Sequence, residues 1–89
     1  MPVVVVPTAY RGPTRGESEI PVEGATVRAC LLAVEAKYAG FLPQVLDAGG
    51  RVHRFVKLFI NGELISPEAL EAPVEADDRV EVLAAIAGG

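Results

Sequence analysis

Two glycines, Gly88 and Gly89, close the sequence and leave the final carboxylate as the group with the clearest chemical use. They follow an apolar run from Arg79 to Ile86 that has the character of a β-strand. Glycine tolerates nearly any backbone angle and has no Cβ, so a Gly-Gly tail fits a narrow channel in a partner enzyme. The sequence therefore favours chemistry done on this protein at the carboxylate of Gly89, and a frayed terminus without function is the alternative.

The other candidate chemical groups lack partners in the sequence. Cys30 is a lone cysteine, so it forms no internal disulfide, and packing beside an apolar helix stripe is favoured over a sulfur-relay role. His53 has no second histidine or cysteine near it, so we expect no metal site. Asp77 and Asp78 are adjacent in a turn, and we expect them to cap that turn rather than act as a catalytic pair. These residues do not assemble into a nucleophile, a base and an orienting group, so we expect no enzyme.

One basic cluster stands out in a chain whose net charge is −4: Arg51, His53, Arg54 and Lys57. The acidic balance speaks against nucleic acid as a ligand and favours a basic partner surface for the molecule as a whole. The basic cluster itself either meets an acidic patch on a partner or is solvated at a strand edge, and solvation is favoured.

The composition describes one small folded domain. Eighty-nine residues bury only roughly 60% of their unfolded surface, so the core is modest and we expect no deep enzyme cleft. An apolar fraction of 51% and a charged fraction of 22% are ordinary for a globular protein. The sequence shows no signal peptide and no apolar run of about 18 residues, so we expect a cytoplasmic protein without a membrane partner.

The first half of the chain predicts two strands and a helix. Residues 3–6 are a continuous valine run typical of a buried strand, and residues 17–22 resume strand character and return antiparallel after a loop. Thr26 is a good N-cap, and Val27, Leu31, Val34 and Tyr38 then form one apolar helix stripe, which Gly40 ends. Residues 41–47 look like a short helical turn interrupted by Pro43.

The second half predicts a hairpin and a final strand. Residues 54–60 alternate, and we assign Val56, Leu58 and Ile60 to the core. Asn61-Gly62 is a strong turn signal that joins this strand to residues 63–65. In the last strand we expect Val80 and Val82 to point inward.

These elements predict an α+β fold in which a mixed sheet carries one main helix on one face. A single helix leaves the other sheet face uncovered, and Phe55, Phe59 and Leu83 are expected there as an exposed apolar patch that binds a partner. A register shifted by one residue, or loops folded over the patch, would remove it.

The order of these elements and the ending resemble the β-grasp sulfur-carrier proteins of the MoaD/ThiS type. The matching features are the valine-rich first strand, the helix capped by Thr26, the Asn61-Gly62-Glu63 turn and the hydrophobic last strand that runs into Gly-Gly. The resemblance spans the whole chain. It implies a ubiquitin-like β-grasp domain over residues 1–86 and a flexible Gly-Gly tail over residues 87–89.

Two segments are most similar to the branch of this family that serves cysteine biosynthesis. They are His53-Arg54-Phe55-Val56, before the Asn-Gly turn, and Ala85-Ile86-Ala87-Gly88-Gly89 at the end. Ala84-Ala85 stands where carriers for molybdopterin synthesis often have Pro-Pro, which weighs against a molybdopterin role. The sequence leaves the final sulfur acceptor open among cysteine, molybdopterin, thiamin and other sulfur-containing metabolites.

The resemblance implies a protein cosubstrate that binds no cofactor itself. An E1-like adenylating and sulfur-transferring enzyme would use ATP and Mg to activate the Gly89 carboxylate while Ala87 and Gly88 thread into it. Sulfide or a persulfide would then give a C-terminal thiocarboxylate. The further partners implied are a sulfur-accepting synthase, such as a PLP-dependent cysteine synthase, and a zinc metallopeptidase. A ubiquitin-like protein modifier and a β-grasp binding module with an inert tail are the alternatives.

Overall fold

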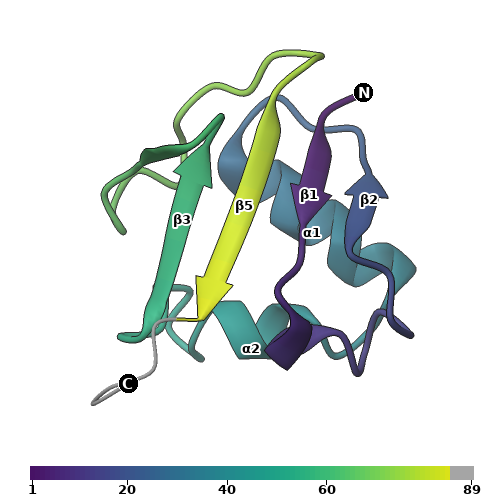
Figure 1. The fold of residues 1–89 in the computed structure, drawn as a ribbon. Helices are drawn as coiled ribbons and strands as arrows, with labels where there is room; N and C mark the ends of the chain where they lie inside the picture. The colour runs from purple at the N-terminus through teal and green to yellow at the C-terminus, as the bar shows by residue number, and fades with distance from the viewer. Residues whose placement is uncertain (85–89) are drawn as a thin grey trace.

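The computed structural model describes residues 1–84, in which one sheet carries helix α1 across one of its faces (Figure 1). The sheet has five strands in the order β2-β1-β5-β3-β4 among these residues. β1 and β5 are parallel, and the other neighbouring pairs are antiparallel, so the predicted mixed sheet with one main helix is confirmed. Along the chain the elements are β1 (Val3–Val5), the 3₁₀ helix η1 (Thr8–Tyr10), β2 (Glu19–Pro21), α1 (Val27–Lys37), α2 (Leu42–Val45), β3 (Val56–Ile60), β4 (Glu63–Leu64) and β5 (Arg79–Ala84).

The core lies between the sheet and α1, and the period-2 patterns of β3 and β5 place side chains in it as predicted. Val80 and Val82 of β5 are buried, and so are Val56 and Leu58 of β3. Val82 pairs with Leu58, so inward residues of neighbouring strands lie side by side. Ile60 is partly buried and packs against the same core.

α1 begins where the sequence predicts. The Thr26 side chain accepts a hydrogen bond from the Ala29 N–H at 3.1 Å and satisfies one of the free donors of the first turn. Val27, Leu31 and Val34 of the predicted stripe are fully buried. The helix ends at Lys37, and Gly40 follows with a φ of +102°, a left-handed conformation that suits glycine after a helix.

Two local predictions need correction. Pro43 does not interrupt a helical turn, because it occupies the first turn of α2, where its missing N–H would have no helical partner in any case. The connection between β1 and β2 is not only loop, since it contains η1 and a turn held by the fully buried Thr14. The Thr14 hydroxyl donates to the Glu17 carbonyl at 2.9 Å.

The Asn61-Gly62 turn is confirmed and is tied to the start of β5. Asn61 and Gly62 both have positive φ, 51° and 85°, as a two-residue hairpin turn requires. The Asn61 side chain donates to Asp78 Oδ1 at 2.8 Å and accepts from the Arg79 N–H at 2.9 Å. Asp78 also accepts a hydrogen bond from the Glu75 N–H at 2.8 Å. This bond has the larger effect, and together with the bond from the Asn61 side chain it lowers the pKa of the Asp78 carboxyl. The hairpin thereby sets where β5 enters the sheet.

Candidate functional site

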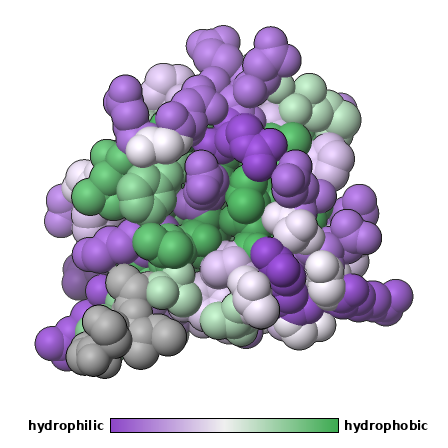
Figure 2. Space-filling model, viewed as in Figure 1, coloured by the Kyte–Doolittle hydropathy of each residue, from purple (hydrophilic) through white to green (hydrophobic). Residues whose placement is uncertain are grey.

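The sheet face opposite α1, called here the outer face, carries an apolar surface. Leu83 follows the inward Val82 on β5, points outward and is 47% exposed. Phe59 is an outward residue of β3, partly buried, and pairs with Glu81 on β5 and with Leu64 on β4. Figure 2, which views this face, shows hydrophobic side chains gathered over the strands and hydrophilic ones around them.

The predicted patch and the outer face overlap without being identical. Phe59 and Leu83 lie on the outer face, whereas Phe55 lies one residue before β3, is 47% exposed and has the Arg54 guanidinium 5.3 Å from its ring centroid. The structure adds Leu64, which is 61% exposed and directly opposite Phe59. Leu64 was missed, although a two-residue Asn-Gly turn already implies the pairing of residues 59 and 64.

β1 adds two further apolar residues to the outer face, and the sequence pattern does not predict them. Val4 is fully buried, and the alternation along β1 turns Val3 and Val5 outward, where both are partly buried. A run of consecutive valines contains no alternation, so the two faces of this strand are not distinguishable in the sequence.

The predicted tail residues Ala87, Gly88 and Gly89 lie outside the described residues, so their roles stay predictions. The structure does place the strand that leads to them. β5 lies between β1 and β3, and Ala84, its last residue, pairs with Val56 at the start of β3. Gly89 follows Ala84 by five residues in the sequence.

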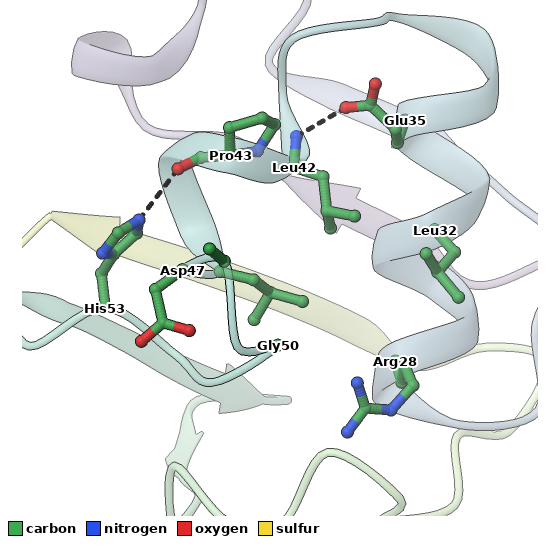
Figure 3. A pocket seen from close by; sticks show the side chains of 10 residues that line it. Arg28, Leu32, Glu35, Leu42, Pro43, Asp47, Gly50 and His53 are labelled. Atoms are coloured by element: carbon green, nitrogen blue, oxygen red, sulfur yellow. Dashed lines mark hydrogen bonds between the residues drawn. The ribbon is translucent and has the colours of Figure 1, made fainter.

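A hollow of about 710 Å³ lies on the other side of the molecule, between α1 and the segment that contains α2 (Figure 3). Its apolar lining includes Leu32, Leu42 and Leu46. Of the charged groups at its rim, the Glu35 carboxylate accepts the N–H groups of Gly40 at 3.1 Å and Leu42 at 2.7 Å, which joins α1 to α2. This carboxylate is therefore part of the local structure.

The remaining polar residues of the hollow also serve the fold. Arg28 donates to Glu71 at 2.6 Å, and His53 Nε2 donates to the Pro43 carbonyl at 2.9 Å. Asp47 Oδ1 accepts the N–H groups of Arg51 and Gly49, and the bond from Arg51 is the main reason why the pKa of its carboxyl is lowered. Within residues 1–84 the hollow thus offers apolar surface and no nucleophile paired with a base.

Cys30 is fully buried, as the packing interpretation predicts. Burial raises the pKa of its thiol, which disfavours the reactive thiolate. Among residues 1–84, no group of three or more His, Cys, Asp or Glu side chains is arranged to hold a metal ion. In the same part of the chain, none of the helices has the length and apolar character needed to span a membrane.

Comparison with known proteins extends the structural result. Residues 4–89 match the ThiS family. The sulfur carrier proteins CysO of Mycobacterium tuberculosis and Mycobacterium bovis are each 35% identical to this chain over 89 residues, which is 97% of this chain and 96% of theirs. The predicted similarity to the MoaD/ThiS family is confirmed, and the relatives found within it are CysO proteins.

Solved structures agree with this assignment. CysO from Amycolatopsis orientalis, in a complex with BexX, has a TM-score of 0.90 and 34% identity, and the match covers both chains completely. Mycobacterium tuberculosis CysO has a TM-score of 0.88 and 29% identity over 97% of this chain and all of that one. Small archaeal modifier protein 1 from Methanosarcina acetivorans, with a TM-score of 0.83 and 24% identity, shares the fold. The ubiquitin-like β-grasp prediction is therefore confirmed, and the chain belongs to the ThiS family.

Proposed function

We propose that this chain is a sulfur carrier whose Gly89 carboxylate is activated and converted to a thiocarboxylate. The observation that carries the proposal is the 35% identity to the sulfur carrier proteins CysO over nearly the whole of both chains. The ThiS family match runs through residue 89 and so includes both glycines. In this scheme the chain is a cosubstrate, and its partner enzymes do the catalysis.

The chemistry follows from the poor reactivity of a carboxylate, whose leaving group would be an oxide. A carboxylate oxygen of Gly89 attacks the α-phosphorus of Mg-bound ATP on the activating enzyme and displaces pyrophosphate. Sulfide sulfur then attacks the acyl carbon, and AMP leaves with the oxygen it shares with that carbon. The path splits one difficult substitution into two easier ones and leaves a C-terminal thiocarboxylate.

The similarity to CysO supports cysteine synthesis as the pathway served. The sulfur acceptor is then a PLP-dependent cysteine synthase, and a zinc metallopeptidase releases cysteine and regenerates the Gly89 carboxylate. The small residues Ala87 and Gly88 allow the tail to enter both partners. The chain itself holds neither cofactor in this scheme.

The activating enzyme docks on the outer face in this proposal. Leu83 lies on that face only six residues before Gly89, so a partner that covers it is also within reach of the tail. Phe59 extends the same surface, and Phe55 lies just before the strand that contains Phe59. Apolar surface next to the reacting end gives the partner a place to bind that the tail alone lacks.

The test is intact mass spectrometry of the chain after incubation with ATP, magnesium, sulfide and a candidate activating enzyme. We expect an oxygen-to-sulfur mass gain confined to the C-terminal fragment that contains Gly88 and Gly89. Gly89→Phe should gain no sulfur because its ring blocks entry into a narrow channel. Gly12→Phe is the matched control, since a Cβ at Gly12 meets no atom within 4 Å, and it should load like the wild type.

Other outcomes identify other functions. A wild-type chain that stays unmodified with several activating enzymes refutes the sulfur-carrier proposal and favours a binding module. Stable conjugates of higher mass in cell extract, dependent on Gly89, indicate a protein modifier. Loading of Gly89→Phe at the wild-type rate contradicts the threading mechanism.

A further inference from the structure

Charge is segregated along the second half of the chain. Between residues 49 and 62 the charged side chains are all basic, and between residues 63 and 78 they are all acidic. The basic residues are Arg51, Arg54 and Lys57, and the acidic residues are Glu63, Glu68, Glu71, Glu75, Asp77 and Asp78. A molecule with net charge −4 therefore contains a basic stretch with no acidic residue inside it.

The fold places the acidic residues Glu63, Glu75 and Asp78 beside the Asn61-Gly62 turn, at the far end of β3 from the basic cluster. Glu68 of the same acidic segment instead lines a hollow together with Arg51. β3 begins beside the basic cluster and ends at the Asn61-Gly62 turn, and the acidic segment leads from that turn to the start of β5. β5 then runs back antiparallel to β3, so Lys57 lies opposite Leu83 and Val56 opposite Ala84. The basic cluster consequently lies at the end of the sheet from which the chain continues toward Gly89 (Figure 1).

The cationic groups of the basic cluster are available to a partner. Arg51, Arg54 and Lys57 are exposed, and the ion pairs formed within residues 1–84 are Arg28–Glu71 and Arg79–Glu19. Asp47 lies near Arg51 and His53, and Glu68 lines a hollow together with Arg51, so both carboxylates lower the positive charge around Arg51. Arg54 and Lys57 are therefore the cations of the basic cluster on which the argument rests.

Arg54 connects the basic cluster to the apolar surface. Its guanidinium lies 5.3 Å from the centroid of the Phe55 ring, which is itself 47% exposed. Lys57 adjoins Leu83 across the β3–β5 pair. Positive charge therefore borders the apolar residues on the side that leads to the tail.

We propose that the basic cluster binds an acidic surface of the activating enzyme beside the channel that receives the tail; this rests on the proposed sulfur-carrier function. An acidic partner surface attracts this end of the molecule and repels the acidic residues beside the Asn61-Gly62 turn. Encounters are therefore steered into the orientation that brings Gly89 to the channel. Complementary charge of this kind raises the association rate and selects against wrong orientations.

The experiment measures the rate of sulfur loading against chain concentration, with the activating enzyme, ATP, magnesium and sulfide at low salt. The test variant is Arg54→Glu/Lys57→Glu, which changes the net charge from −4 to −8 because each replacement removes one positive charge and adds one negative charge. The matched control is Arg15→Glu/Lys37→Glu, with the same change at exposed residues outside the β3–β5 pair. Arg54→Gln/Lys57→Gln neutralises the basic cluster without reversing it.

We expect the KM of the test variant to rise about tenfold while that of the control changes less than about twofold, with kcat nearly constant in both. The neutral variant should fall between them. Added salt should raise the KM of the wild type and have little effect on the neutral variant.

Equal KM increases in the test and control variants would overturn the inference, because the total charge alone would then explain the effect. An unchanged KM in the test variant would overturn it as well. Loading of the wild type in either case leaves the proposed function intact, whereas a wild type that gains no sulfur refutes the proposed function and this inference with it. Circular dichroism melts of all variants test whether unfolding causes a change in KM.

Discussion

Replacing Leu83 by alanine should weaken binding of the activating enzyme and leave the fold intact. Leu83 points outward from β5 and is 47% exposed, so part of its surface is still in contact with water. Complete burial of a leucine side chain contributes about 1.5–3 kcal/mol, and the exposed half therefore has roughly 0.7–1.4 kcal/mol left to contribute when a partner covers it. Since 1.4 kcal/mol is a factor of ten, we expect the KM for sulfur loading to rise about three- to tenfold.

Leu32→Ala is the matched control, because Leu32 is 48% exposed but lies on α1 at the edge of the hollow. The two substitutions remove similar exposed area from different sides of the molecule. The assay is the rate of sulfur loading against chain concentration, read by intact mass spectrometry, with thermal melts to compare stability. Equal KM values for the two variants would refute the docking argument, and a larger effect of Leu32→Ala would move the partner to the hollow.

Three further predictions concern the fold. Thr26→Ala should lower the free energy of unfolding by about 1 kcal/mol, because it removes the α1 cap, and lower the melting temperature by about 4–8 °C; Thr26→Ser should retain most of the stability. The pKa of Asp78 lies below its usual 3.8 because the Glu75 N–H and then the Asn61 side chain donate to the charged carboxylate. The contribution of Asp78 to stability is therefore complete above about pH 3.8 and is lost as the pH falls through the lower pKa that Asp78 has in the folded protein. The melting temperature of the wild type should therefore fall more steeply in acid than that of Asp78→Asn. Parallel curves of melting temperature against pH would contradict this. Cys30 should react with iodoacetamide only as fast as the protein opens, since its thiol is buried and its pKa raised, and labelling at the rate of a free thiol would show that the native structure exposes it.

The parts of the fold that the sequence predicts are those where one local rule acts alone. The alternation in β3 and β5 separates core from surface because successive side chains point to opposite faces. Asn61-Gly62 identifies the hairpin because both residues tolerate the positive φ that the turn requires. Thr26 identifies the helix start because its hydroxyl satisfies a first-turn donor.

The parts that the sequence does not predict depend on contacts between distant segments. The valine run of β1 predicts a buried strand, but Val3 and Val5 are only partly buried because no second layer covers the outer face within residues 1–84. The sequence favours solvation of the basic cluster, and its arginine and lysine side chains are exposed in the structure. The sequence does not show that Lys57 lies beside Leu83. That neighbourhood follows only from the register of β3 against β5.

β5 serves stability and the proposed partner contact with different residues. Val80 and Val82 face the core, where they pack against residues of the neighbouring strands, whereas Leu83 faces outward beside Lys57. A smaller residue at Val82 would leave a cavity and weaken the sheet that holds the start of the tail. A change at Leu83 or Lys57 alters the proposed partner surface and leaves the core packing in place. The alternation of the strand thus allows the proposed partner surface to change while the domain that precedes Gly89 keeps its stability.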